Sequence, residues 1–469
     1  MLNGLGLENF KAFKKRSNLP FKKLNVFLGP NSSGKSSFIK ALMLLSETIK
    51  NSDEEPALQL SEDIGDFKSI TYGNINKGKL TFALSFSNSV TDDEKALLIK
   101  KNRNYFIHGF LFSKQRKQFS LNELDRYIQN CLNTYTEAPI SHVEFTIKQT
   151  PKRPNIVDNL VIHMTNGINF SIKMDRNSFY IYKGNETFSQ PNIFVPYKFI
   201  FKLDEKKLQQ SVPEEVQDIM LLTIAFTHLE SQLQQFYKQF LRIEPFRYRP
   251  ERTEYIPNFK YKSVGSDGRN TLSAVMGLVQ KDNDSSSRLV KEKINYWLQE
   301  FSLAQKVEVK ELGSNQYSLI IKNKYTGVTS NIVDVGVGTS QLLPIILETF
   351  MSAPNSVLAI EEPETHIHPN AQARLAEMFT QAIDQEKRFF IETHSMYFVQ
   401  QLQILVAENK LTPQDVGIYY FSQDEEGSHI QNLEILPNGQ FKDAFPSGFF
   451  DVAFELSKKL MYAAKKKRD

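Results

Sequence analysis

A glycine-rich segment near the start of the chain has the residue types of a phosphate-binding loop. Gly29-Pro-Asn-Ser-Ser-Gly34-Lys35-Ser36 fits the pattern G-x-x-x-x-G-K-[ST]. In that pattern backbone N–H groups hold the α- and β-phosphates, the lysine reaches the β/γ oxygens and the hydroxyl ligates Mg²⁺. An apolar run at 24–28 precedes it and a helical pattern follows over 35–49, which is the strand-loop-helix context the mechanism needs. The residues expected to bind nucleotide are Gly29, Asn31, Ser32, Ser33, Gly34, Lys35, Ser36 and Ser37.

A second loop of small residues precedes an apolar helical pattern at 342–347. It reads Asn331-Ile-Val-Asp-Val-Gly-Val-Gly-Thr-Ser-Gln341. Such a loop offers uncovered amides and the positive end of a helix to an anion. We therefore predict a second phosphate-binding surface, whose candidate residues are Gly336, Gly338, Ser340 and Gln341.

Two further apolar runs end in residues that can do chemistry. Val357-Leu-Ala-Ile360 leads into Glu361 and Glu362, and the run at 388–391 leads into Glu392-Thr-His394. Carboxylates at the C-terminal edge of a sheet can hold Mg²⁺ and polarise an attacking water. Each motif alone is weakly specific, but their order and spacing together are specific, since Gln341 lies 20 residues before Glu361 (361 − 341).

These motifs in this order resemble the ABC-type ATPase head, in the branch that includes RecF-like, chromosome-maintenance and overcoming-lysogenization-defect (OLD) ATPases. The stretches 361–369 and 392–395 resemble the OLD side of that branch, as do Asn9-Phe-Lys-Ala-Phe13 and the ending at 448–451. The resemblance covers about 1–90 and 325–455. The middle of the chain matches only through Ile243-Glu-Pro-Phe-Arg247.

The resemblance implies roles for the matching residues. Glu361 takes the magnesium-side position together with Ser36, and Glu362 takes the position of the catalytic base. His394 takes the γ-phosphate-sensing position, so that the expected catalytic residues are Glu362, His394 and Lys35. The segment from Gly336 to Gln341 takes the position of the signature that reads ATP across a dimer. Glu361 is one methylene longer than the usual aspartate, so metal contact through water is expected, and Gln59 is a weak candidate for the glutamine loop.

The expected fold class is α/β: an ABC-type P-loop ATPase head, with a mixed sheet plus an antiparallel β layer, and a helical and β insertion. Residues 1–90 are expected to form the N-terminal half of the head and 313–469 the C-terminal half with signature, Walker B carboxylates and histidine switch. The insertion at 91–312 is expected to contain β hairpins, a long helix at 211–242 and a helix at 287–301.

Within these expected domains the sequence predicts several local features. Strands are expected at 79–86 and 142–148, and a hairpin at 161–172 turns at Asn166-Gly167, a type I′ signal. A polar, basic segment at about 95–120 interrupts this layer. Ser211 and Glu214 could form a capping box. The apolar stripe that follows indicates either a core helix, which we favour, or an oligomer contact; it contains Leu222, Phe226, Leu229, Leu233, Phe236 and Phe240.

Composition limits the classes of protein to consider. The 469 residues indicate two or three domains, and 57 Lys+Arg against 53 Asp+Glu give a net charge of only +4, which names no partner. A single cysteine, Cys131, excludes a disulfide framework within the chain. The N-terminus does not read as a secretory signal and no window reaches the length of a membrane span. We expect a cytoplasmic protein without a membrane partner.

Three other motifs have a less favoured functional interpretation. His366 and His368 could suggest zinc, but they lie where the resembling family has a dimer-contact loop. Asp282-Asn-Asp284 looks like the D-x-D of a TOPRIM nuclease in a polar loop, and Glu308-Val-Lys310 resembles an E-x-K nuclease site that an exposed strand face explains as well. The sequence therefore favours an ATPase without its own nuclease.

The expected function is Mg²⁺-dependent ATP hydrolysis by a sensor and scaffold, acting as a homodimer or larger even homo-oligomer. The resemblance suggests bacterial anti-phage defence, with control of a separate nuclease or toxin effector. The alternative is a DNA repair or recombination ATPase acting directly on nucleic acid, whose footprint would be 100–117 and the arginines Arg247, Arg249 and Arg252. A transporter subunit is disfavoured by the large insertion.

Overall fold

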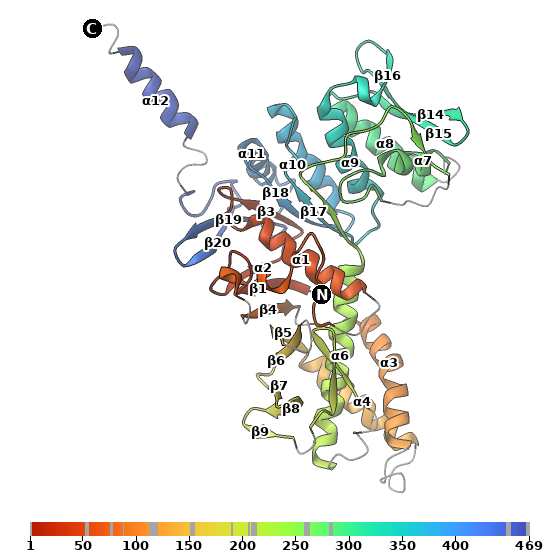
Figure 1. Ribbon diagram of the computed structural model, residues 1–469, viewed down its shortest axis with the longest axis vertical. Helices are drawn as coiled ribbons and strands as arrows, with labels where there is room; N and C mark the ends of the chain where they lie inside the picture. The colour runs from red at the N-terminus through yellow and green to blue at the C-terminus, as the bar shows by residue number, and fades with distance from the viewer. Residues whose placement is uncertain are drawn as a thin grey trace. The chain divides into compact units, whose positions relative to one another are not determined.

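The structure, a computed structural model, divides into two compact units (Figure 1). The first unit contains Met1–Phe21, Ser37–Lys238 and Gln423–Ile430, and the second contains Lys22–Ser36, Gln239–Ser422 and Gln431–Asp469. The residues that the structure describes are 2–51, 56–75, 78–87, 89–111, 121–150, 155–188, 191–204, 207, 213–257, 263–280, 285–446 and 452–465.

A six-stranded sheet forms the centre of the second unit. Its first five strands run parallel to their neighbours, whereas the last two are joined by a two-residue turn, which requires an antiparallel pair. The predicted fold class, α/β with a mixed sheet, is thus confirmed. In sheet order the strands are β12 (Phe240–Ile243), β17 (Val357–Glu361), β18 (Arg388–Glu392), β3 (Leu24–Leu28), β19 (Val416–Asp424) and β20 (Gly427–Leu433), and residues 423–430 of the last two strands and their turn belong to the first unit.

The register of this sheet brings distant motifs to one edge. β3 and β17 are buried at every position, as expected for parallel strands covered on both faces. Glu361 pairs with Glu392 across β17 and β18, and Glu392 pairs with Phe27 across β18 and β3. Because parallel strands end at the same edge, both carboxylates lie beside the point where residues 29–36 leave β3.

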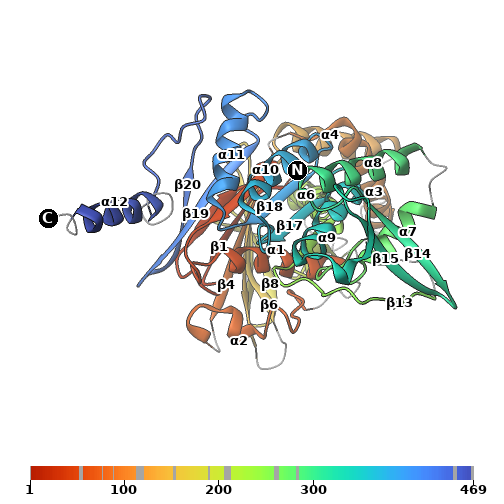
Figure 2. The same ribbon diagram turned by 90° about the horizontal axis from the view of Figure 1, so that it is seen from above.

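Helices of the second unit bury the apolar faces of this sheet. α10 packs against β18, β3 and α11, and both helices lie beside β18 in Figures 1 and 2. α9 contributes Leu342, Ile345 and Ile346 to the same core. The helices described in this unit are α7 (Thr271–Gln280), α8 (Ser285–Glu300), α9 (Val337–Met351), α10 (Pro369–Ile383), α11 (Met396–Ala407) and α12 (Val452–Lys465).

A small antiparallel sheet leads to the start of α9. Helices α7 and α8 pack against its longest strand, and a 3-10 turn, η3 (Ile332–Asp334), connects its last strand to α9. Its strands are β13 (Glu254–Tyr255), β14 (Lys306–Gly313), β15 (Gln316–Lys322) and β16 (Thr329–Asn331).

The first unit is built on an eight-stranded antiparallel sheet, which is the antiparallel β layer expected from the sequence. Buried and less buried positions alternate along its strands, as in a sheet with one face on a core. In sheet order the strands are β2 (Ser17–Pro20), β1 (Leu2–Glu8), β4 (Lys79–Phe86), β5 (Ile140–Lys148), β6 (Ile156–Met164), β7 (Asn169–Asp175), β8 (Ser178–Lys183) and β9 (Glu186–Thr187); a separate hairpin contains β10 (Phe194–Tyr197) and β11 (Ile200–Leu203).

Helix α6 (Pro213–Lys238) is the core helix of the first unit. It packs against α3 and α4, and its stripe residues Leu222, Phe226, Leu229, Leu233 and Phe236 are at most 5% exposed. The stripe therefore packs inside its own unit, as the favoured interpretation expected. The other helices of this unit are α1 (Lys35–Lys50, from Ser37 onward), α2 (Phe67–Ile70), the 3-10 turn η1 (Tyr72–Asn74), α3 (Asp92–Leu111) and α4 (Leu121–Glu137).

The predicted helix at 211–242 is too long at its C-terminal end. α6 ends at Lys238, and Phe240–Ile243 forms β12, which pairs with β17. A short apolar run fits a buried strand as well as a helix face, and pairing with β17 decides between them. Ser211 lies outside the described residues, so the expected capping box does too. The helix expected at 287–301 is α8, Ser285–Glu300.

The polar segment expected at 95–120 begins with a helix that the sequence interpretation missed. α3 covers Asp92–Leu111, and 112–120 lie outside the described residues. Thr91 and Glu94 form a reciprocal capping box: the Thr91 N–H donates to Glu94 Oε2 (2.8 Å), and the Glu94 N–H donates to Thr91 Oγ1 (3.3 Å). This T-x-x-E signal was present in the sequence.

The turn between β6 and β7 is not type I′. Of Asn166 and Gly167 only Gly167 has a positive φ, +84°, and its N–H donates to the Met164 carbonyl (3.1 Å). This is a type I turn followed by a left-handed glycine, which gives a three-residue loop instead of a two-residue one.

Candidate nucleotide-binding site

The loop from Gly29 to Ser36 has a backbone that glycine makes possible. Gly29 and Gly34 have φ of +137° and +104°, and Ser32 has φ of +62°. A Cβ on Gly29 would lie 2.1 Å from the Phe421 carbonyl oxygen, so no other residue fits there. The loop then enters α1 at Lys35, as predicted; Asn31 and Ser32 are exposed, and Ser33 is buried with no hydrogen-bond partner for its Oγ.

Lys35 is held inside the loop by the loop's own carbonyl groups. Its Nζ donates to the carbonyls of Gly29 (3.0 Å) and Pro30 (2.8 Å) and lies 3.8 Å from Glu392 Oε1. Burial lowers the pKa of this lysine, whereas Glu392, Glu362 and Glu364 favour its charged form. An incoming phosphate can replace the two carbonyls as the hydrogen-bond partner of the Lys35 ammonium. The positive charge that the phosphate needs is therefore already in the site.

Glu392 is hydrogen-bonded to the first turn of α1, although the sequence interpretation gave it no role. Its Oε1 accepts a hydrogen bond from the Ser36 hydroxyl (2.9 Å), and its Oε2 is buried without a partner. Burial, with the neighbouring Glu361 and Glu362, raises the pKa of Glu392 to about 7, against the opposing effect of Ser36 and Lys35. Its position at the end of an apolar strand, like that of Glu361, was the available signal.

Glu361, predicted on the magnesium side, makes an ion pair that the sequence did not reveal. Its Oε1 accepts from Arg242 Nε (2.7 Å), and Arg242 lies on β12, the neighbouring parallel strand. Both side chains are largely buried. The structure therefore places Glu361 beside Glu392, with an arginine as its charge partner.

Glu362 begins an acidic turn beside the loop. Its φ is +46°, which is unusual for a residue other than glycine, and its Oε2 accepts from Thr365 Oγ1 (3.3 Å). Glu364 follows: its Oε1 accepts from the His394 backbone N–H (2.6 Å) while its Oε2 is buried without a partner. Burial raises the pKa of Glu364. The carboxylates of Glu362 and Glu364, both on this turn, therefore lie close enough to Lys35 to interact with its charge.

His394 is exposed at the end of β18, where the sequence predicted it. Although the residue is exposed, partial desolvation of its ring and the charge of Lys35 lower the pKa of the imidazole below its ordinary value, and Glu362 opposes this shift. This shift favours the neutral imidazole, which has one N–H to donate. Lys35, Glu362 and His394, predicted from three separate motifs, are thus brought into one site.

The signature residues lie at the N-terminus of α9. Gly336 is the N-cap, makes no side-chain capping bond and is exposed. The Ser340 hydroxyl donates to the Val337 carbonyl (2.9 Å), and Gln341 Nε2 makes a long contact with the Arg247 carbonyl (3.5 Å). A Cβ on Gly338 would lie 2.9 Å from the His366 carbonyl. Within the described residues, these bonds do not reach 29–36 of the same chain.

Magnesium fits the oxygen atoms at the start of α1 and the end of β18. Among the described residues, no group of three or more His, Cys, Asp or Glu side chains is arranged to hold a metal ion. Mg²⁺ is commonly bound by one or two protein groups together with substrate phosphates. Ser36 Oγ and the unpartnered Oε2 of Glu392 supply oxygen ligands of that kind, with Glu361 adjacent in the sheet.

Glu392 gives the nucleotide-free chain a stability that depends on pH. Because its pKa is about 7 instead of the ordinary 4.5, its contribution to folding is fully present below about pH 4.5 and is lost as the pH rises through about 7. Glu392→Gln removes the carboxyl group whose ionisation causes this loss of stability. We expect a smaller decrease in Tm between about pH 5.5 and about pH 8.5 than in the wild type, measured without Mg²⁺ and nucleotide. Glu254, whose pKa is also about 7, is present in both proteins and contributes equally to both. A decrease in Tm as large as that of the wild type would therefore contradict the assignment of this pH dependence to Glu392.

Several residues that could have formed other sites have roles within the fold. His368 is the N-cap of α10, and its Nδ1 accepts from the Asn370 N–H (3.3 Å), so it has a structural role. Glu308 forms an ion pair with Lys306 on β14. Arg252 pairs with Asp334 (2.8 Å). The segment Asp282-Asn-Asp284 and the ending at 448–451 lie outside the described residues.

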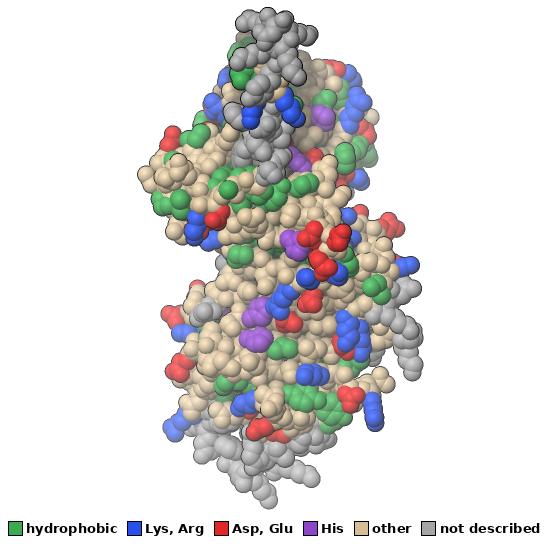
Figure 3. All heavy atoms as spheres, turned by 90° about the vertical axis from the view of Figure 1, so that its left-hand side faces the viewer, with side chains coloured by type: hydrophobic (Ala, Val, Ile, Leu, Met, Phe, Trp, Pro, Cys, Tyr) green, Lys and Arg blue, Asp and Glu red, His purple; other side chains and the backbone are tan. Residues whose placement is uncertain are grey.

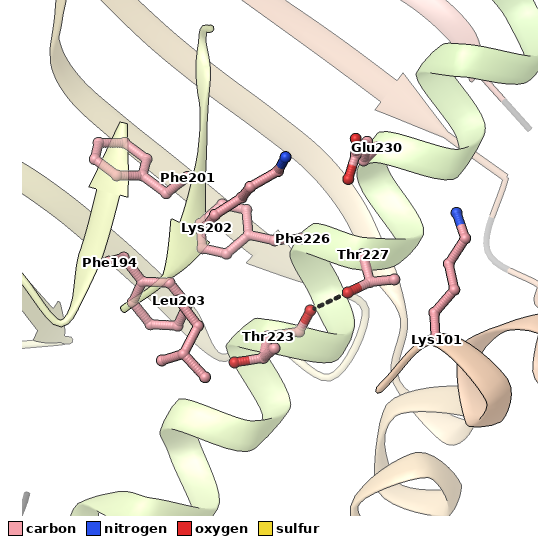
Figure 4. Close-up of a pocket in the computed structure, with 9 residues that line it drawn as sticks. All are labelled: Lys101, Phe194, Phe201, Lys202, Leu203, Thr223, Phe226, Thr227 and Glu230. Atoms are coloured by element: carbon pink, nitrogen blue, oxygen red, sulfur yellow. Dashed lines mark hydrogen bonds between the residues drawn. The ribbon is translucent and has the colours of Figure 1, made fainter. Parts of the chain in front are cut away.

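A hollow of about 290 Å³ in the first unit contains none of the predicted site residues (Figure 4). Its two threonine hydroxyls already have partners, because Thr223 Oγ1 donates to the Ile219 carbonyl (2.7 Å), and Thr227 Oγ1 lies within hydrogen-bond distance of the Thr223 carbonyl (2.8 Å) and of Asn102 Oδ1 (3.0 Å). Its phenylalanine rings are almost fully buried and contact each other. It is lined by Lys101, Phe194, Phe201, Lys202, Leu203, Thr223, Phe226, Thr227 and Glu230.

The loop at 29–36 has a backbone that requires glycine, lies between a buried parallel strand and a helix, and holds a lysine buried beside carboxylates. These features define a P-loop nucleoside triphosphatase. The match to known families is more specific. The chain belongs to the AAA ATPase domain family, whose model matches residues 1–399. Residues 411–460 match a second family, described as a protein of unknown function (DUF3696).

Solved structures of SMC heads are similar to the chain at low sequence identity. An SMC head domain from Thermotoga maritima has 10% identity and a TM-score of 0.36, with 92% of this chain and 99% of that chain covered. An Smc head with an extended coiled coil, bound to the C-terminal domain of ScpA and derived from Pyrococcus furiosus, has 8% identity and a TM-score of 0.39, with 100% and 99% covered. No curated protein matches the chain. Within the described residues, none of the helices combines the length and apolar character needed to cross a membrane.

Proposed function

We propose that the protein is a Mg²⁺-dependent ATPase of the ABC type, whose active sites are completed by a second copy of the chain. This proposal rests on the observation that the signature lies apart from the other residues of the site. The P-loop, Glu362 and His394 are brought together, whereas the uncapped N-terminus of α9 makes its contacts elsewhere. The signature in this arrangement is available to ATP held by another subunit.

Each residue of the proposed site has a separate task in hydrolysis. The loop amides and Lys35 bind the phosphates, and Lys35 compensates negative charge on the β/γ oxygens. Glu362 orients the attacking water and accepts its proton, and neutral His394 donates to the γ-phosphate. When bound, Mg²⁺ would be held by Ser36 and the adjacent carboxylates and would supply further compensation of phosphate charge.

Mixing two inactive variants tests the composite site. Lys35→Ala removes the phosphate-binding half, and Ser340→Arg places a bulky charge at the signature while its own P-loop stays intact. A mixed pair contains one complete site, so we expect the mixture to recover up to about a quarter of wild-type turnover, since half of the pairs are mixed and each has one of two sites. ATPase activity is measured after subunit exchange.

A chain with both substitutions provides the matched control. Mixed with the Lys35→Ala chain, it cannot rebuild any complete site and should stay inactive. A Lys35→Ala and Ser340→Arg mixture that also stays inactive, although differently tagged chains are shown to exchange, would rule out a signature acting in trans.

We further propose that ATP binding and hydrolysis control a separate effector, a nuclease or toxin, in a cytoplasmic anti-phage system. This proposal is supported by the resemblance of 361–369 and 392–395 to OLD ATPases and by the absence of a clear nuclease motif in the sequence. The same reasoning favours a chain that does not cut nucleic acid itself.

The second candidate is an ATPase acting directly on DNA, which the chromosome-maintenance resemblance supports. Arg247 must be removed from the residues expected to contact DNA, because it is only 7% exposed and its guanidinium donates to the Glu361 carbonyl. Arg249 remains exposed, while Arg252 is paired with Asp334. On the face drawn in Figure 3, basic and acidic side chains are interspersed instead of forming one basic surface, which favours the sensor over the DNA-binding function.

A further inference from the structure

Arg247 is a buried cation next to the proposed catalytic turn. It follows β12 and is 7% exposed, although the preceding Phe246 is 89% exposed. Burial lowers the pKa of its guanidinium to about 10, while Glu364, Glu362 and Glu361 favour the charged form. At neutral pH the group is therefore charged, and its position must be maintained by specific interactions, because a buried charge is costly without partners.

The bonds of Arg247 are made to backbone atoms of the carboxylate-bearing residues. Its Nη2 donates to the carbonyl oxygens of Glu361 (2.8 Å) and Glu362 (3.1 Å). Its Nε and Nη1 are buried and have no hydrogen-bond partner. An arginine whose role was only to stabilise the fold would be expected to satisfy these groups, since each unmet donor costs about 1–3 kcal/mol.

Glu362 needs such support because of its backbone conformation. A φ of +46° is unfavourable for a residue with a Cβ, at a cost of about 1–3 kcal/mol that persists only when the surroundings enforce it. Its N–H donates to the Glu392 carbonyl (2.8 Å), and Arg247 holds the two carbonyls on the other side. Three of the hydrogen bonds that fix the backbone of Glu361 and Glu362 therefore come from outside the turn, two of them from one guanidinium, and the Thr365 N–H adds a longer bond to the Glu362 carbonyl within the turn (3.3 Å).

We propose that Arg247 is a positioning residue for ATP hydrolysis, which holds Glu362 in its strained conformation so that its carboxylate meets the attacking water. This inference rests on the proposed function of Glu362 as the base. It assigns Arg247 to the rate of the chemical step and not to the binding of ATP, because the guanidinium contacts neither the loop at 29–36 nor the signature amides among its described bonds.

The expected result for Arg247→Met is a kcat lower by about 10–100-fold, because small displacements of a catalytic group have effects of this size. The dissociation constant for a non-hydrolysable ATP analogue should change by less than about threefold. Arg247→Ala should regain part of its kcat when methylguanidinium is added, because the small cation can donate to the same two carbonyls. Arg288→Met, which removes an exposed arginine paired with Glu292 on α8, is the matched control and should behave like wild type.

Two results would overturn this assignment while leaving the ATPase proposal intact. One is an Arg247→Met kcat within about twofold of wild type. The other is an equal loss of kcat and of nucleotide affinity without rescue by methylguanidinium, which would indicate a purely structural role. If Arg247→Met does not fold, Arg247→Gln replaces it, since its shorter, uncharged side chain cannot reach both carbonyls, and an unchanged kcat overturns the inference. A wild-type chain without ATPase activity would overturn both proposals.

Discussion

Lys35→Ala is expected to abolish ATP turnover and to weaken ATP binding. The Lys35 ammonium is buried and already held by two loop carbonyls 3.0 and 2.8 Å away, so its charge is positioned before nucleotide arrives. Alanine leaves the β/γ oxygens facing Glu392, Glu362 and Glu364, the carboxylates that interact with Lys35, without the cation between them. We expect steady-state ATPase activity at background level, measured by phosphate release.

The control for this prediction is Lys23→Ala, which removes a half-buried lysine paired with Asp415 (3.4 Å) just before β3. Surface pairs of this kind contribute about 0–1 kcal/mol, so its activity and Tm should remain close to wild type. Full ATPase activity in Lys35→Ala would end the assignment of residues 29–36 as the nucleotide-binding loop.

The parts of the site that could be predicted are those with local sequence signals. β3, β17 and β18 are apolar runs that end at a glycine or an acidic residue, and a buried parallel strand must have such a run. For this reason Lys35, Glu362 and His394 could be placed at strand ends from sequence alone. Their meeting in one site follows from the parallel register of three strands.

The parts that could not be predicted depend on pairing between distant segments. Arg242 and Glu361 are separated by 119 residues, and only the pairing of β12 with β17 brings them together. Because 240–242 was predicted as the end of a helix, neither Arg242 nor Arg247 could be placed beside the turn at Glu361 and Glu362. Arg247 was instead considered as a DNA contact, since a single sequence does not distinguish a buried arginine from an exposed one.

Glu392 illustrates a different limit. Its sequence context, an apolar run followed by an acid, was as informative as that of Glu361, but the resemblance directed attention to His394 two residues later. Its role becomes visible only from the hydrogen bond with Ser36 and the unpartnered Oε2. The buried, unpaired oxygen is a property of packing, which no residue pattern contains.

Glu362→Gln is expected to lower kcat by about 10²–10⁴-fold while ATP binding is retained. Glutamine has the same shape, and its amide oxygen can still accept from Thr365 Oγ1, as the Glu362 carboxylate does (3.3 Å). The turn and its bonds to Arg247 and Glu392 involve backbone atoms and should be unaffected. The amide, however, is a poor base and cannot take the proton of the attacking water.

Because hydrolysis no longer releases the closed state, the Glu362→Gln chain should stay associated with a second copy in the presence of Mg²⁺ and ATP. Sedimentation with and without ATP measures this association, and Glu311→Gln, an exposed change of the same kind on β14, provides the control. Adding Lys35→Ala to Glu362→Gln should abolish the ATP-dependent association, because closure requires bound nucleotide. If Glu362→Gln hydrolyses ATP at the wild-type rate, the base must be another group, for which Glu364, on the same turn and within electrostatic reach of Lys35, is the next candidate.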